Sequence, residues 1–86
     1  MPKETEIEVI YGEIKQRIAE LYENNKGFKI APMKEIDIVD YLEQYFFHNI
    51  DNFFLINSII TESELVPFKN DTQINLMFRR IRNLRK

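Results

Sequence analysis

The fold is decided by one apolar stretch in the middle of the chain, Ile36-Asp37-Ile38-Val39-Asp40-Tyr41-Leu42-Glu43-Gln44-Tyr45-Phe46-Phe47-His48-Asn49-Ile50-Asp51-Asn52-Phe53-Phe54-Leu55-Ile56-Asn57-Ser58-Ile59-Ile60. Large side chains at this density leave water only by entering a core or covering a partner. Glu43 and Asp51 interrupt the stretch, whereas a membrane-spanning helix needs about 20 mostly apolar residues without such charges. The stretch therefore predicts the core of a globular protein, and we expect no membrane partner.

Length and composition predict one domain over residues 1–86. The chain has 86 residues, of which 44 % are apolar and 30 % charged, as in ordinary globular proteins. It contains no cysteine, so a disulfide framework and a thiolate metal site are both excluded. The polar start, residues 1–6, lacks the apolar region of a secretory signal, and we therefore expect a cytoplasmic protein.

Charge is distributed unevenly along the chain, whose net charge is −2. Residues 1–24 carry −3 and residues 25–68 carry −4, whereas residues 69–86 carry +5. An acidic front and a basic end are the most informative global feature of this sequence.

Apolar residues recur at steps of three and four, which predicts an all-α bundle of about four helices over residues 4–24, 33–47, 51–60 and 71–85. The first helix has the clearest inward stripe, formed by Ile7, Ile10, Ile14, Ile18 and Leu21. Gly12 costs about 1 kcal/mol relative to alanine inside a helix, so we expect a neighbour to approach closely there. Gly27 suits the left-handed position that ends a helix.

The second helix is expected to begin near Pro32, which favours the first helical turn. One face of this helix is apolar, and we expect it to point into the core. It is formed by Ile36, Val39, Leu42 or Glu43, and Phe46, and is broadened by Ile38, Tyr41 and Tyr45. Between the first two helices, residues 28–30 form at most a very short strand. The order of these elements, a helix, an extended segment and a second helix that begins at Pro32, resembles the start of a winged helix-turn-helix. Residues 50–60, where its recognition helix would lie, carry no basic residue, and we assign no family.

The segment after His48-Asn49 has two interpretations. A third helix over residues 51–60 is preferred, while a hairpin over residues 53–62, turning at Asn57-Ser58, is the alternative; such a turn usually contains glycine.

Thr61 and Glu64 match a capping box, so a short helical turn is expected to begin there and to stop before Pro67. Asn70 or Asp71 then caps the last helix, whose inward stripe is Ile74, Met77, Phe78, Ile81 and Leu84.

Two sets of residues are candidates for binding. The basic set belongs to the last helix and can neutralise phosphates or an acidic protein surface, although such residues also pair with acids on neighbouring helices; it comprises Arg79, Arg80, Arg82, Arg85 and Lys86. The aromatic set comes from the central stretch, which holds more large side chains than a small core needs; it comprises Tyr41, Tyr45, Phe47 and Phe54.

No pattern in the sequence indicates catalysis, a metal or a cofactor. A helix would place His48 on one face with Asp40 and Gln44, but one histidine and one carboxylate are a thin ligand set. No glycine-rich phosphate loop exists, since the only glycines are Gly12 and Gly27. Serines and carboxylates lack the neighbours that nucleophilic or acid–base chemistry requires. We therefore expect a non-enzymatic protein without cofactors.

These observations favour a small regulatory or adaptor protein that acts by contact with another protein or with a second copy of itself. Its isoleucine- and asparagine-rich composition is typical of AT-rich genomes, so a viral or low-GC bacterial regulator that docks on a larger complex, such as the transcription machinery, would fit. The alternative is a protein that binds nucleic acid through its basic C-terminal helix.

Overall fold

The computed structural model describes residues 2–50 and 60–86. This part of the chain contains four α-helices and no strand: α1 (Lys3–Lys26), α2 (Pro32–His48), α3 (Glu62–Lys69) and α4 (Thr72–Leu84). The predicted all-α fold is confirmed, and the helices expected over residues 4–24, 33–47 and 71–85 end within two residues of the observed bounds. The helix predicted over residues 51–60 and its hairpin alternative lie almost wholly outside the described residues.

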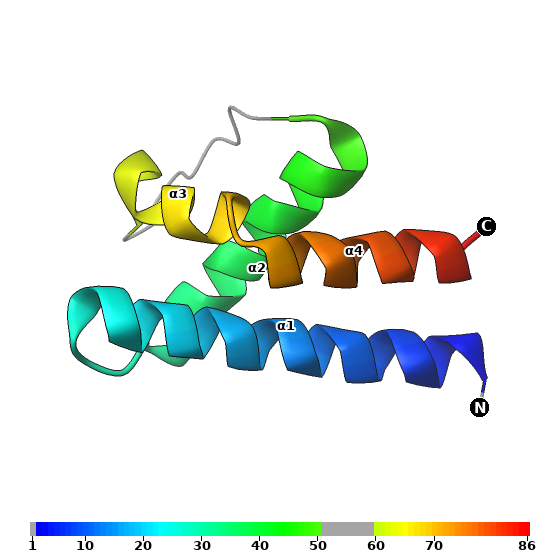
Figure 1. Cartoon of the computed structure of the whole chain (residues 1–86), viewed down its shortest axis with the longest axis horizontal. Helices are drawn as coiled ribbons and strands as arrows, with labels where there is room; N and C mark the ends of the chain where they lie inside the picture. The colour runs from blue at the N-terminus through cyan, green and yellow to red at the C-terminus, as the bar shows by residue number, and fades with distance from the viewer. Residues whose placement is uncertain (1, 51–59) are drawn as a thin grey trace.

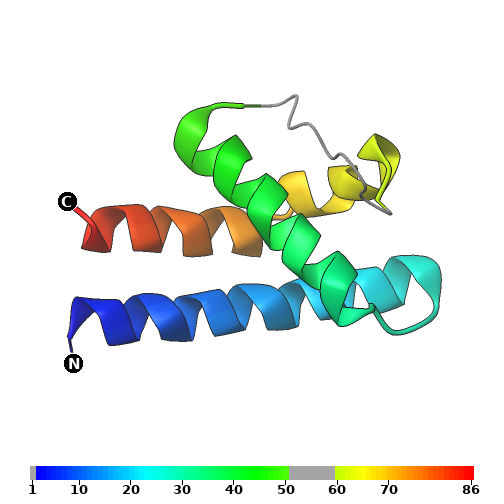
Figure 2. The ribbon, with the colours of Figure 1, turned by 180° about the vertical axis from the view of Figure 1, so that it is seen from behind.

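Helices α1 and α4 lie side by side and run in opposite directions, so that the N- and C-terminal ends of the chain lie at the same end of the molecule (Figure 1). Helix α2 crosses this pair obliquely on one face, as the reverse view shows (Figure 2). Helix α3 precedes α4 and lies above the C-terminal half of α1 (Figure 1). Within the described helices, none is both long and apolar enough to cross a membrane.

The core forms where the inward stripes of α1 and α4 meet. Six residues of these two helices are each 2 % exposed or less: Ile10, Ile14, Ile18, Ile74, Phe78 and Ile81. These are residues that the helical spacing predicted. Burying each such side chain stabilises the fold by about 1.5–3 kcal/mol, which makes α1 and α4 the main packing pair.

Helix α2 buries most of its predicted apolar face, Val39 included, but not the part formed by Ile36. Ile38 and Leu42 are fully buried, whereas Ile36 is 53 % exposed. The helix carries two adjacent apolar stripes, and spacing alone does not say which one faces the neighbours. The prediction that Ile36 points into the core is therefore wrong, because the packing surface follows the Ile38 stripe.

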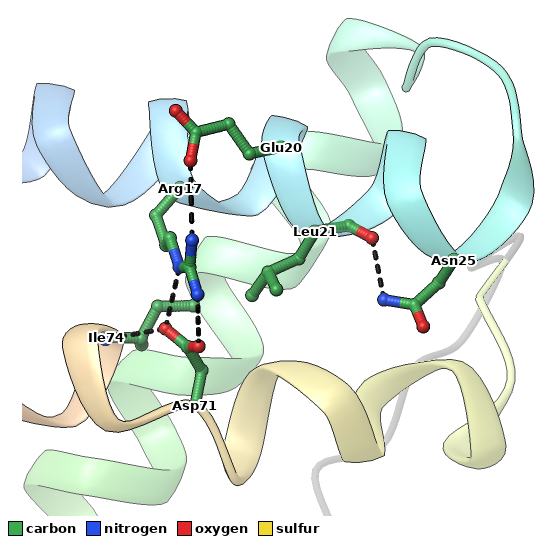
Figure 3. Close-up of polar contacts among 6 residues, drawn as sticks. All are labelled: Arg17, Glu20, Leu21, Asn25, Asp71 and Ile74. Atoms are coloured by element: carbon green, nitrogen blue, oxygen red, sulfur yellow. Dashed lines mark hydrogen bonds and ion pairs between the residues drawn. The ribbon is translucent and has the colours of Figure 1, made fainter.

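A polar junction joins the middle of α1 to the start of α4 (Figure 3). The guanidinium of Arg17 donates from Nε and Nη2 to the two carboxylate oxygens of Asp71, at 3.0 and 2.8 Å. The same carboxylate accepts from the backbone N–H of Ile74 at 3.0 Å, which makes Asp71, and not Asn70, the N-cap of α4. Arg17 also reaches Glu20 on its own helix at 3.4 Å. One carboxylate thus starts α4 and fixes it against α1.

Helix α3 corrects the expectation of a turn that stops before Pro67. The helix contains Pro67 and continues to Lys69. Proline removes the hydrogen bond that its N–H would give four residues back, which here concerns only the carbonyl of Ser63 in the first turn. Thr61 precedes the helix as predicted, but the side chain of Glu64 lies 3.4 Å from Lys34 Nζ instead of closing a capping box.

The chain leaves α1 and α2 through left-handed residues. Gly27 ends α1 with φ 79°, as predicted, and donates to the carbonyl of Glu23. Asn49 ends α2 with φ 54°, a conformation that asparagine tolerates better than most residues. Gly12 departs from expectation: a Cβ there would meet nothing within 4 Å, so no described neighbour approaches it closely.

Replacing Phe78 by alanine is expected to lower the free energy of unfolding by about 3–5 kcal/mol, because its ring is fully buried and leaves a cavity. Leu76 on the same helix is 49 % exposed, and its replacement by alanine is expected to change that free energy by less than about 1 kcal/mol. Urea denaturation followed by circular dichroism measures both. Equal effects of the two substitutions would contradict the packing described here.

The Arg17 guanidinium, and next the backbone N–H of Ile74, hold the pKa of Asp71 below its ordinary value of 3.8. A lowered native pKa adds stability that is present above about pH 4 and is lost as pH falls through the native value. Asp71→Asn keeps a capping side chain but removes the charge, so it should destabilise the protein at pH 7, and its difference from wild type should shrink below pH 4. Glu8→Gln, at an exposed site of α1, is the control in pH-dependent denaturation; a constant difference for Asp71→Asn would refute this account.

Candidate functional site

An aromatic cluster lies where α2 crosses α4. The buried ring of Phe78 stacks on Phe46 with centroids 5.1 Å apart and meets Phe47 edge-on at 5.3 Å. Tyr45 contacts Phe46 at 4.9 Å, and Tyr11 of α1 reaches Phe78 at 6.3 Å. Phe78 is therefore the ring on which both neighbouring helices converge.

A hollow of about 370 Å³ opens above this cluster, between the end of α2 and the solvent-facing side of α4. Phe78 and Asn49 contribute to its lining, together with Tyr45, Phe46, Phe47, Asn75, Arg79 and Arg82. A second hollow of about 450 Å³ adjoins it at the α3–α4 junction, and the two share Tyr45, Asn75 and Arg79. We call the two hollows together the α2–α4 cleft.

The charged side chains in the described lining of this cleft are all basic. Its described lining contains the cations Lys69, Arg79 and Arg82 and no aspartate or glutamate, although the chain as a whole carries a net charge of −2. Lys69 Nζ lies 4.8 Å from the centre of the Tyr45 ring, within the range of a cation–π contact. The cleft therefore combines positive charge with half-buried aromatic surface.

The arginines of α4 divide into two groups. Arg80 pairs with Glu13 of α1 at 3.3 Å, and Arg85 lies 3.5 Å from the hydroxyl of Tyr11. Arg82 donates to the carbonyl of Phe46 in the last turn of α2 and sits over the Phe47 ring at 5.8 Å. Three of the guanidinium groups are thus engaged by neighbouring helices.

Arg79 is different, since it makes no hydrogen bond or ion pair with any described residue. It is exposed at the shared border of the two hollows. Lys86 is also exposed, at the chain end. Arg79 is therefore the guanidinium of the cleft that can offer its full set of donors to a partner.

The structure places the predicted aromatic set in three environments. Tyr45 and Phe47 are half-buried in the lining of the cleft. Tyr41 is only 4 % exposed, because α2 turns this residue toward the core; its contact with a partner stays a prediction. Phe54 lies outside the described residues. The basic and aromatic sets, which the sequence presented separately, meet at Tyr45, Phe47, Arg79 and Arg82.

Sequence reasoning missed several lining residues. Leu76 and Asn75 stand three and four positions before Arg79, so helical spacing could have placed them on its face. Lys69 and Asn49 belong to the ends of α3 and α2, and only the crossing of the helices brings them to the cleft. No periodic signal could have identified those two.

A separate hollow of about 290 Å³ lies on the α1 side of α2, lined by Tyr11, Lys15, Ile36, Val39, Asp40, Glu43 and Arg85. Burial, followed by the hydrogen bond to Glu43, raises the pKa of Tyr11 to about 12. Acids and bases balance within this lining, so it has no preference for either sign of charge.

His48, the candidate metal ligand, is exposed in the last turn of α2, where a basic side chain suits the helix end. No group of three potential metal ligands gathers in residues 2–50 and 60–86.

Comparison of the chain with protein-family models, with curated proteins and with solved structures finds no significant match. The chemistry of the cleft is therefore the basis for inferring a function.

Arg82→Ala is expected to lower the free energy of unfolding by about 0.5–1.5 kcal/mol, because the Phe46 carbonyl loses its donor. Arg79→Ala removes the same charge from the same helix but no contact within the described structure, and its effect is expected to stay within about 0.5 kcal/mol. Thermal and urea denaturation of the two variants measures the difference. If Arg79→Ala were the more destabilising change, the division of the arginines would be wrong.

Proposed function

We propose that this chain is a non-enzymatic binding module that docks on another protein through the α2–α4 cleft. The observation that carries the proposal is the convergence of half-buried aromatic rings with positively charged side chains in one hollow that has no described acid. Protein interfaces are enriched in aromatic residues and arginine, and their energetic centres are aromatic or arginine side chains in desolvated pockets. Tyr45, Phe47 and Arg79 supply these residue types.

Nucleic acid is the second candidate, and the distribution of the arginines favours it less. Affinity for a polyanion grows with the number of phosphates that a protein neutralises, and specific DNA binders contact about 6–10. Here Arg80, Arg82 and Arg85 are engaged by Glu13, Phe46 and Tyr11. The unengaged charge is too small and too local to follow a nucleic-acid backbone.

A docking role also agrees with the size of the cleft. Its hollows, of about 370 and 450 Å³, have room for a few side chains of a partner. What larger assembly the module serves, the transcription machinery included, stays a prediction from the sequence.

Site-specific photocrosslinking tests the proposal. A photoreactive phenylalanine at Asn75, in the cleft, is compared with the same group at Gln16, on the exposed side of α1. We expect a protein adduct from position 75 in lysate of the source cells, about tenfold stronger than from position 16, resistant to nuclease and reduced by Arg79→Glu. Arg79 has no described partner, so its substitution should leave the fold intact, which circular dichroism checks.

Adducts of equal strength from both positions would refute the cleft as the docking surface. Adducts that disappear on nuclease treatment would replace the proposal by the nucleic-acid alternative. Self-adducts at position 75 that match a dimer mass would identify the partner as a second copy of the chain.

A further inference from the structure

The chemistry of the cleft also restricts what its occupant can be. We infer that the α2–α4 cleft takes a short acidic segment of a partner protein, in which one or two carboxylates flank an apolar anchor side chain. This inference rests on the proposed function and names the class of ligand. It follows from three properties of the described lining: its charge, its exposed apolar surface and its amide groups.

The positive charge of the lining determines that the bound segment carries negative charge. Arg79 has no described partner, and its planar guanidinium can bind a carboxylate through two parallel hydrogen bonds. Lys69, which also lines this hollow, has its ammonium group over the ring of Tyr45. With no described acid in the lining, a cationic segment would find no counter-charge there, whereas a carboxylate would meet the guanidinium of Arg79.

The exposed apolar surface of the cleft determines that the anchor side chain of the partner is apolar. Leu76 is 49 % exposed and lies one helical turn before Arg79, in the same hollow. The half-buried rings of Tyr45, Phe46 and Phe47 continue this surface into the adjoining hollow. A leucine or phenylalanine side chain of the partner would cover these atoms while a neighbouring carboxylate reaches Arg79.

Asn75 lines both hollows of the cleft, and its side chain ends in an amide. It can donate and accept at once, as a partner backbone requires. A hydrogen bond from this side chain would set the direction of the bound segment. A peptide can make all three contacts: through its carboxylates, its apolar anchor and its backbone. A phosphate chain offers only the negative charge, so the cleft suits a peptide better.

The experiment uses the full chain labelled with ¹⁵N and a synthetic peptide of about a dozen residues, in which glutamates flank a central Phe-Leu pair. Two control peptides replace the glutamates by lysine or the Phe-Leu pair by alanine, and a single-stranded thymidine oligonucleotide of similar length is the nucleic-acid probe. Titration followed by amide chemical shifts reports both affinity and place. Side-chain signals of Asn75 and Arg79 mark the cleft, and the backbone amide signal of Lys15 marks the separate hollow between α1 and α2.

We expect the acidic peptide to shift the signals of Asn75 and Arg79 and to leave Lys15 unchanged. Arg79→Ala should weaken binding about three- to tenfold, the range for losing one hydrogen-bonded contact of ordinary strength at an exposed site. Arg80→Ala removes the same charge one residue later, beside Glu13, and should leave the affinity unchanged. Arg79→Lys should be intermediate, since lysine keeps the charge but lacks the planar fork.

Other outcomes would overturn the inference. It fails if the acidic peptide causes no shift at millimolar concentration, if the peptide without its Phe-Leu pair binds equally well, or if the oligonucleotide binds the cleft more tightly. The failure is separable from that of the proposed function. A nuclease-resistant protein adduct at position 75 with no binding of the peptide would keep the docking role and reject the acidic occupant, whereas loss of the adduct as well would reject both.

Discussion

The arrangement of the molecule depends on the burial of one aromatic ring, that of Phe78. This side chain is 1 % exposed and meets rings from two different helices, Tyr11 of α1 and the Phe46–Phe47 pair of α2. A single ring that must be covered from both directions restricts how α2 can cross the α1–α4 pair (Figure 2). The same crossing brings the last turns of α2 beside the solvent-facing residues of α4, so the packing requirement also creates the cleft.

The position of α4 between two neighbours explains the different roles of its arginines. On the α1 side, Arg80 meets the acidic face of that helix at Glu13. On the α2 side, Arg82 satisfies the Phe46 carbonyl near the helix end, where carbonyl groups lack helical donors. Arg79 borders both hollows of the cleft and makes no hydrogen bond or ion pair with a described residue. Neighbouring basic residues of one helix therefore differ in role: some bind the adjacent helices, and one makes no such contact.

Local order could be predicted from the sequence, and the arrangement of the helices could not. The spacing of Ile10, Ile14 and Ile18 and the stop at Gly27 specify α1 because both act within a few residues. The bond between Arg17 and Asp71 spans 54 positions, and no periodic signal connects residues that far apart. The candidate site shows the same limit: its aromatic and basic parts were both predicted, but their meeting depends on a crossing that only tertiary packing determines.

Exposed apolar surface alone would not have selected the cleft. Val9, Phe28, Met33 and Ile36 are each about half exposed or more and lie in α1, the α1–α2 connection or the first turns of α2, and single exposed apolar side chains are normal on small proteins. The α2–α4 cleft differs because its apolar atoms adjoin a guanidinium that the described fold leaves without a partner. In a chain with more acids than bases, a lining with cations and no described acid is the less expected property, and it gives this surface a preference for negatively charged partners that the scattered apolar residues lack.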